Sequence, residues 1–249
     1  MTREGWIRLL VVALFIAALE AACRGGLIPR TVLIAPSAMA DSLWHLLRSG
    51  EYAADIISTL RNVVAASVLS VVLGFALGVG LHALPRLRRA VEPLLASYYA
   101  IPTFMFYPVF IVVFGVSPRA IIAIAVLLSI VAMIAGTLTG LDRIPPVLRK
   151  TAQILRMSAP TRALLIDLPA AAPHLFTGIK LAFAYAFIGV IASEFILSGS
   201  GIGYAIAYAY NNFENRKMYG LMLLVIVLAT AANTVLDLID RRLQARLQR

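Results

Sequence analysis

Long apolar stretches, separated by short charged ones, are the main pattern of this chain. A helix that crosses a lipid bilayer needs about 20 mainly apolar residues. The apolar residues run continuously, whereas the strands of a membrane barrel alternate apolar and polar positions. The pattern therefore predicts an all-α integral membrane protein with about six transmembrane helices. The candidate stretches lie at 6–23, 62–84, 93–118, 120–141, 175–197 and 218–236.

The composition supports the same assignment. The chain has 249 residues, of which 61% are hydrophobic and 14% are charged. A soluble domain of this length cannot bury so much apolar surface. The net charge of +10 does not indicate nucleic-acid binding, because the basic residues flank the apolar stretches instead of clustering in one soluble region. The single cysteine, Cys23, excludes an internal disulfide framework and a cysteine-rich metal site.

The distribution of Lys and Arg predicts which side of the membrane each loop faces. Six spans would place both ends of the chain on one side. With both ends in the cytoplasm, 15 of the 22 Lys and Arg residues lie inside and the other seven lie outside. Cytoplasmic loops carry an excess of basic residues, so this orientation is favoured. Arg3 and Arg8 before the first stretch also resemble a cleaved signal peptide, but the further spans favour a retained helix.

The spans and their charges divide the chain into four parts. The second part contains a short amphipathic helix at 38–48, where Leu43, Trp44 and Leu47 share one side, and Trp favours the headgroup zone of a membrane. The parts are a first transmembrane helix at 1–24, an outer segment at 25–61, a core of five spans at 62–240 with a cytoplasmic loop at 142–174, and a basic cytoplasmic tail at 241–249.

The cytoplasmic segment 150–169, KTAQILRMSAPTRALLIDLP, has no room to span a membrane. Around its start, an apolar stripe recurs at three- and four-residue steps, which predicts a short helix with one apolar side. Such a helix buries that side in lipid headgroups or in the groove of a soluble partner. The stripe is Leu148, Thr151, Ala152, Leu155 and Ala159, and Arg149, Lys150, Gln153 and Arg156 lie on the other side.

The ending Ile166-Asp167-Leu168-Pro169 and its position between spans resemble the cytoplasmic EAA loop of permease subunits of ATP-binding-cassette (ABC) importers. Further stretches resemble the nitrate, sulfonate and taurine branch of that family. The resemblance implies the architecture of a type I ABC importer permease, with a loop that docks into a separate ATPase subunit. The further stretches are STLR at 58–61, Ile101-Pro102, Phe114-Gly115, GIK at 178–180, ASEF at 192–195 and GSGIGY at 199–204.

Two positions in the loop depart from the family pattern. Counted back from Leu168-Pro169, the family's Glu-Ala-Ala falls on Lys150-Thr151-Ala152, and its later glycine falls on Arg156. An arginine there implies a changed local geometry or a matching acidic patch on the ATPase. Ser158 remains able to cap the helix that Pro160 helps to start. The resemblance assigns ATPase coupling to Lys150, Thr151, Ala152, Leu155, Arg156, Met157, Ser158 and Arg162.

Glu194 is the acid that most needs an explanation, because an ionised carboxylate in hydrocarbon costs several kcal/mol. It lies shortly before the Leu197-Ser198-Gly199 break, near the predicted outer interface. The structural interpretation is an ion pair with Arg61 or Arg119 that fixes the helix ends. The functional interpretation is that Glu194 lines the outer gate or contacts a substrate-delivery protein.

Two prolines, Pro102 and Pro108, interrupt the third predicted span. Each frees the carbonyl four residues earlier and kinks the helix. The kink would present aromatic and hydroxyl side chains to cargo; ordinary aromatic packing against a neighbouring helix is the alternative. The candidate pathway or gate residues are Tyr98, Pro102, Thr103, Tyr107 and Glu194, with Tyr99 beside them.

Small residues mark faces suited to close helix packing. Gly74 and Gly78 are spaced by four in the second span, and Gly136 and Gly140 repeat this spacing in the fourth. The packing lies either within one chain or at the seam of a permease dimer.

These observations predict a membrane subunit that forms half of the passage of an ATP-driven importer. The chain has no Walker A sequence, so we expect no enzyme activity, no catalytic residue and no cofactor bound by this chain, with ATP and Mg²⁺ on the partner ATPase. A metal site is not expected either, because His45, His82 and His174 are far apart in sequence and fall on different sides of the membrane.

The resemblance also implies the partners and the place of this subunit. The partners are two cytoplasmic ABC ATPase subunits, a second permease copy in a preferred homodimer, and a soluble substrate-binding protein. The place is the bacterial cytoplasmic (inner) membrane. The branch implies a small anion such as a sulfonate or nitrate as cargo.

Two other classes of function were compared with this prediction. An ion-coupled secondary transporter should place paired acids, or an acid with a histidine, at mid-membrane. The centres of the third and fourth spans carry no charge, which disfavours proton coupling and leaves sodium sites made from carbonyls open. An intramembrane enzyme would need nucleophile, base or metal ligands that converge at one depth, and the sequence offers none.

Overall fold

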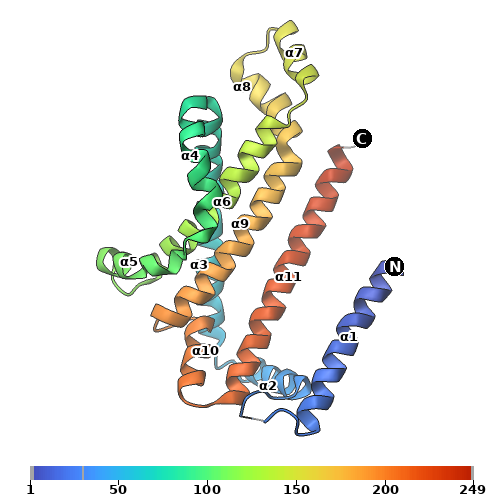
Figure 1. Cartoon of the computed structure of the whole chain (residues 1–249), viewed down its shortest axis with the longest axis vertical. Helices are drawn as coiled ribbons and strands as arrows, with labels where there is room; N and C mark the ends of the chain where they lie inside the picture. Colours follow the sequence, from blue (N-terminus) through green and yellow to red (C-terminus); the bar gives the residue numbers. More distant parts are fainter. Residues whose placement is uncertain (1–2, 30, 248–249) are drawn as a thin grey trace.

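The computed structural model describes residues 3–29 and 31–247, and these ranges form helices and turns without a strand (Figure 1). Two 3₁₀ segments, η1 (Tyr98–Ala100) and η2 (Thr103–Phe106), and one π-helical segment, η3 (Ala163–Asp167), join some of the helices. The α-helices are α1 (Arg3–Arg24), α2 (Pro36–Ser49), α3 (Ala53–Ala83), α4 (Pro85–Ser97), α5 (Tyr107–Phe114), α6 (Pro118–Asp142), α7 (Pro146–Ile154), α8 (Ala159–Arg162), α9 (Leu168–Leu197), α10 (Ile202–Asn211) and α11 (Asn215–Leu247).

Five helical stretches of the described chain are long and apolar enough to cross a membrane. They lie in α1, α3, α6, the continuous stretch from α8 to α9, and α11. The pair α4 and α5 makes a sixth if its two bent arms count as one span. The all-helical membrane fold with about six spans is therefore confirmed.

The third span differs from the single kinked helix that the sequence predicted over 93–118. It is broken between α4 and α5, and the two arms meet at 96°. Pro102 lies in the break, and the freed carbonyl of Tyr98 accepts a hydrogen bond from Ile101 N–H at 3.1 Å. The carbonyl of Phe104, freed by Pro108, accepts from Tyr107 N–H. Tight 3₁₀ bonds thus satisfy the backbone and stabilise a sharp turn instead of a mild kink.

Three helices, α3, α6 and α9, pack together as the core, and glycines allow them to approach closely. A Cβ added to Gly78 would lie 2.6 Å from the Cβ of Thr137 on α6. A Cβ added to Gly136 would lie 2.7 Å from the Cα of Gly178 on α9. Any larger side chain would push these helices apart. The small-residue faces therefore serve packing within one chain, which answers the question that the sequence left open.

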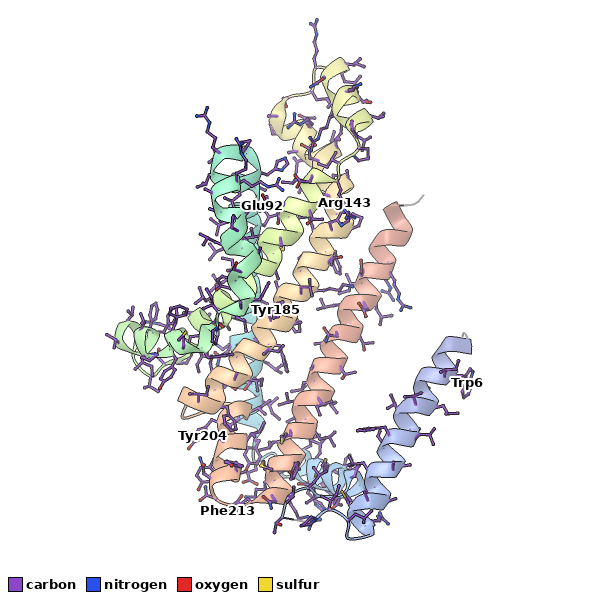
Figure 2. The ribbon with its side chains drawn as sticks, in the orientation of Figure 1. Trp6, Glu92, Arg143, Tyr185, Tyr204 and Phe213 are labelled. Carbon is purple, nitrogen blue, oxygen red and sulfur yellow. The ribbon has the colours of Figure 1, made fainter. Side chains whose placement is uncertain are left out.

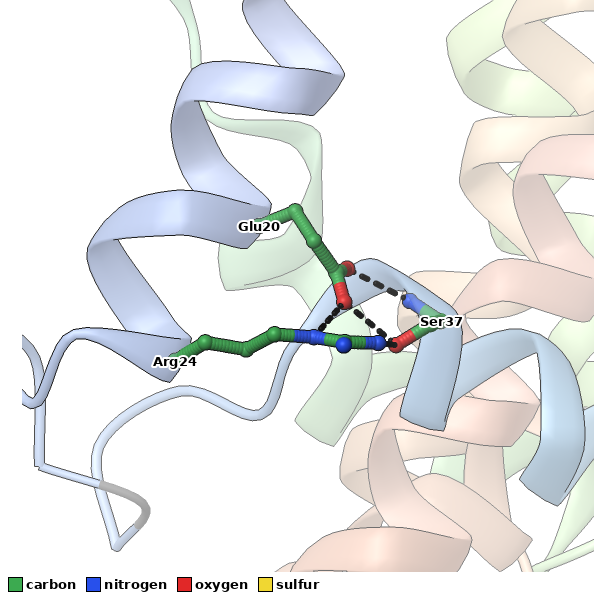
Figure 3. Close-up of polar contacts among 3 residues, drawn as sticks. All are labelled: Glu20, Arg24 and Ser37. Atoms are coloured by element: carbon green, nitrogen blue, oxygen red, sulfur yellow. Dashed lines mark hydrogen bonds and ion pairs between the residues drawn. The ribbon is translucent and has the colours of Figure 1, made fainter.

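Helix α1 stands apart from the core and meets the rest of the chain mainly at α2 (Figure 1). The side chains along α1, including Trp6, project freely on all sides (Figure 2). At its last turn, Glu20 accepts hydrogen bonds from the backbone N–H and the Oγ of Ser37, at 2.9 and 2.6 Å, and pairs with Arg24 (Figure 3). The acid that weakened the first predicted span thus holds the N-terminal turn of α2, where the helix dipole favours negative charge.

The helices give the molecule two distinct ends (Figure 1). We call the end with α7 and α8 the α7 end, and the end with α2 and α10 the α2 end. Helix α11 runs from the α2 end back toward the α7 end. The predicted amphipathic helix at 38–48 is confirmed as α2 and lies against the start of α11, where Ser42 Oγ donates to the carbonyl of Arg216 at 2.7 Å.

Candidate functional site

The segment predicted to couple to an ATPase forms the α7 end. Pro145 and Pro146 start α7, which carries Lys150, Thr151 and Ala152. Ala152 is only 2% exposed, so this face of the short helix packs inward. Arg149 Nη2 donates to the carbonyl of Leu141 at 2.7 Å, which ties α7 to the last turn of α6.

Helix α7 ends at Ile154, five residues before the end of the predicted stripe at Ala159. The cause is a left-handed turn at Arg156, whose φ is 48°. Arg156 N–H donates to the carbonyl of Gln153, and Met157 N–H donates to that of Ala152, both at 3.0 Å. This pair of bonds is the Schellman motif that closes many helices, usually with glycine at the left-handed position. An arginine therefore adopts here the backbone conformation that glycine favours.

The second half of the segment is continuous with the membrane core. Ser158 Oγ accepts a hydrogen bond from Thr161 N–H at 3.4 Å, which confirms the predicted cap of the helix that Pro160 begins. Arg162 pairs with Asp167 at 3.1 Å. Helix α8 continues through η3 into α9 without a loop. Only the π-helical turn η3 therefore separates α8 from α9.

The outer face of α7 carries apolar side chains that the chain itself does not cover. Val147, Ile154 and Leu155 are 70%, 80% and 65% exposed. Val147 and Ile154 are seven residues apart and share one side of the helix, and Leu155 directly follows its last residue. Lys150 and Arg156 have no carboxylate partner among the described residues. We call these five residues the coupling surface. A contiguous apolar patch with a cationic rim is typical of a protein contact site.

The break between α4 and α5 brings three tyrosines together. Tyr98 Oη donates to the carbonyl of Leu127 on α6 at 2.5 Å. The ring of Tyr99 stacks on Tyr185 of α9, with centroids 5.1 Å apart. Sequence reasoning missed Tyr185, although an aromatic hydroxyl in the middle of the fifth span was a visible signal. The arrangement fixes the broken span against both α6 and α9.

The other predicted pathway residues lie around the same break. Pro102 occupies the turn itself, and Thr103 is buried, with its Oγ1 unpaired within the described residues. Tyr107 begins α5, is 37% exposed and makes no ring contact with the three tyrosines in the described chain. The structure thus places this part of the predicted set at one break, but stacks only Tyr98 and Tyr99 of it into the aromatic cluster.

Glu194 is fully buried at the α2 end and is held by neutral donors. Its Oε2 accepts from Thr59 Oγ1 at 2.7 Å and from Gly203 N–H at 3.2 Å, while its Oε1 accepts from Asn62 Nδ2 at 3.2 Å. Asp55 extends the network by accepting from Gly201 N–H at 2.7 Å. The network fastens the loop between α9 and α10 to the start of α3. We call it the Glu194 clamp.

The expected ion pair between Glu194 and Arg61 or Arg119 does not occur in the described chain. The carboxylate points instead at the α9–α10 loop, because glycines there leave room for it. A Cβ at Gly201 would overlap the carboxylate, and the φ of Gly201 is 101°. A Cβ at Gly203 would collide with the Ile191 carbonyl and the Glu194 side chain. Neither arginine has an acidic partner among the residues that the structure describes.

Comparison with known proteins shows the family of this chain. Residues 56–249 match the model of the binding-protein-dependent transport system inner membrane component family. This chain belongs to that family. The permease is 26% identical to a nitrate import permease protein of Leptolyngbya laminosa, over 76% of this chain and 67% of the relative. It is 25% identical to a putative aliphatic sulfonates transport permease protein of Bacillus subtilis, over 97% and 88%.

The solved structures support the fold of the permease. A chain of the MetNI methionine ABC transporter in an inward-facing conformation aligns with a TM-score of 0.66 at 19% identity. The alignment covers 80% of this chain and 96% of that one. The predicted type I ABC importer permease architecture and the resemblance to the nitrate and sulfonate branch are therefore confirmed.

Proposed function

We propose that this permease forms half of the passage of an ATP-driven importer, and that the coupling surface receives the motion of a separate ATPase. The observation that carries this proposal is the exposed apolar face of α7 beside Lys150 and Arg156, which have no acidic partner in the described chain. If this face lay only against lipid headgroups, Ile154 and Leu155 would remain partly exposed to water. A partner groove with an apolar floor and acidic walls satisfies both features.

The energy then reaches the membrane mechanically. ATP and Mg²⁺ bind the ATPase subunits and not this chain, which lacks a Walker A sequence. Two ATPases close on ATP and draw the paired α7 ends together. Because α8 runs into α9, the closure tilts the core helices and opens the passage between the two permease copies toward the opposite side of the membrane. This scheme assigns the coupling role to Lys150, Thr151, Ala152, Leu155, Arg156, Met157, Ser158 and Arg162.

The orientation and the partners complete the proposal. The α7 end and both termini lie in the cytoplasm, which the inner excess of Lys and Arg supports. A second copy of this chain forms the other half of the passage in a bacterial cytoplasmic membrane. A soluble binding protein delivers cargo to the α2 end. The cargo is a small anion, a choice supported by relatives named for nitrate and aliphatic sulfonates.

Co-purification and reconstituted uptake test this proposal. The tagged full-length chain should co-purify with an ABC ATPase. Proteoliposomes that hold the complex should take up nitrate or a small alkanesulfonate only when ATP is present on the side of the ATPase and the binding protein on the opposite side. A variant of the ATPase that cannot hydrolyse ATP provides the control. Uptake that follows an ion gradient, without any ATPase bound, would instead identify a secondary carrier.

A further inference from the structure

A cavity at the α2 end contains two arginines that the coupling mechanism does not use. It has a volume of about 900 Å³ and lies between the start of α3 and the start of α6. Arg61 projects from α3 and Arg119 from the first turn of α6. Ser58, Asn62 and Ser117 also line it, and none of its lining residues in the described chain is acidic.

Three other cations at this end have acidic partners. Arg24 pairs with Glu20 at 2.5 Å, Arg216 pairs with Asp41 at 3.1 Å, and Lys217 pairs with Glu214 at 3.1 Å. Arg61 and Arg119 make neither an ion pair nor a hydrogen bond among the described residues. Two cations that share a cavity repel each other unless an anion lies between them.

The Glu194 clamp explains why the nearest buried acid does not neutralise the cavity. Asn62 lies between the two features, since it lines the cavity and also donates to Glu194 Oε1 at 3.2 Å. Glu194 accepts hydrogen bonds from Thr59, Asn62 and Gly203, and it makes no ion pair with either arginine in the described chain. The cavity therefore keeps a net positive potential, which low-dielectric walls strengthen.

The remaining groups suit an oxyanion. Each guanidinium presents a planar fork of N–H donors that matches the two oxygens of a carboxylate, sulfonate or nitrate. Ser58 and Ser117 add neutral hydroxyl donors. The N-terminus of α6, a helix of 25 residues, opens at the same cavity, and its dipole favours negative charge. The arginines come from α3 and α6, which pack tightly, so the Cα atoms of both arginines hold fixed positions.

We propose that the Arg61–Arg119 cavity binds a small oxyanion, and that it receives the cargo of this permease after release from the binding protein. The receiving role depends on the proposed import function. The binding of the anion does not, and can be measured without ATP or partners. A lipid phosphate offers the same chemistry, so the experiment separates the two sources.

The test places a cysteine in the cavity as a reporter of local charge. Full-length permease with Cys23→Ala and Ser58→Cys is reconstituted in phosphatidylcholine nanodiscs. The rates of labelling by an anionic and a cationic methanethiosulfonate reagent are compared. We expect the anionic reagent to be favoured by about tenfold, the lower end of the enrichment that a cleft lined by one sign of charge gives.

Matched variants connect that preference to the two arginines. Arg61→Gln together with Arg119→Gln should abolish the preference, whereas Arg48→Gln, which removes an exposed cation outside the cavity at the same end, should leave it intact. Excess nitrate or methanesulfonate should slow labelling by the anionic reagent more than chloride does at equal ionic strength.

Three outcomes would overturn the proposal. The first is a preference that survives the double Arg→Gln change. The second is protection by added phosphatidylglycerol but not by free nitrate or methanesulfonate, which would identify a lipid headgroup site. The third is a failure of both reagents to label either Ser58→Cys or the second reporter, Ser117→Cys, since the cavity would then be closed to solvent. All three are independent of ATP-driven uptake, so they are distinguishable from failure of the import function.

Discussion

The coupling surface and the Glu194 clamp are opposite solutions to the placement of polar groups in a membrane protein. At the α7 end, Lys150 and Arg156 have no acidic partner in the described chain, and apolar neighbours stay exposed. At the α2 end, a buried carboxylate is saturated by Thr59, Asn62 and Gly203. The first region leaves its apolar and cationic groups uncovered by the described chain. The second is complete within the chain, and so the two should respond differently to mutation.

The largest effect is expected from Glu194→Gln. The amide replaces one carboxylate oxygen by an NH2 group, which then faces the donors of either Asn62 or of Thr59 and Gly203, and it removes charge-assisted hydrogen bonds. We expect a loss of about 3 kcal/mol in the free energy of unfolding. Thermal unfolding of the purified permease measures this loss. Glu51→Gln is the control, because the side chain of Glu51 is half-exposed. Impaired folding with unchanged cargo preference is the expected pattern, and a clean change of cargo preference would contradict the clamp.

Gly201→Ala should weaken the same clamp from the other side. Its Cβ would overlap the Glu194 carboxylate, and its φ of 101° disfavours any side chain. We expect a destabilisation of about 2 kcal/mol. Gly199→Ala is the matched control, because a Cβ there meets nothing within 4 Å. Equal melting temperatures for the two variants would show that the loop is not held as described.

At the coupling surface, Leu155→Asp should act on assembly and leave the fold intact. Leu155 is 65% exposed, so the new carboxylate remains in water in the isolated chain. In the complex it would place a charge in an apolar contact, and ATPase affinity should fall at least about tenfold, or about 1.4 kcal/mol. Crosslinking and ATP-coupled uptake report this loss. The same substitution at Leu87, which is 48% exposed in the first turn of α4, tests whether any exposed leucine gives the effect.

The smallest effect, with the opposite sign, is expected from Arg156→Gly. A left-handed residue with a side chain costs about 1 kcal/mol, and glycine removes that cost. Hydrogen exchange at Met157 N–H, which closes the α7 turn onto Ala152, should slow in the isolated permease. Lys150→Gly, in the interior of α7, should accelerate the same exchange. Faster exchange in Arg156→Gly would contradict the strain assigned to this turn.

Local patterns predicted much of this fold. Apolar run length gave about six spans, the stripe at 38–48 gave α2, and Ser158 followed by Pro160 gave the cap of α8. These features depend on residues near one another in the sequence. The same holds for the Gly74 and Gly78 face, although its partner helix could not be chosen.

The features that the sequence missed depend on distant or non-additive contacts. Glu194 accepts a hydrogen bond from Thr59, which lies 135 residues away in the sequence. The sequence predicted an ion pair with an arginine instead, because charge is the signal that a sequence makes visible. The 96° break needed two prolines and the docking of Tyr98 on α6. The early end of α7 required Arg156 in a conformation that residue propensity alone disfavours.

The uninterrupted passage from α8 into α9 has a consequence for reach. The apolar helical stretch from Ala159 to Ile196 contains 38 residues, and at 1.5 Å per residue it is about 57 Å long. The hydrocarbon layer is only about 30 Å thick. One rod thus extends well beyond the bilayer, with one tip next to the Glu194 clamp and the other at the α7 end. A small rotation imposed at one tip is magnified into a displacement at the other. The wider π turn at 163–167 and Pro173 inside α9 are the points where the rod can bend.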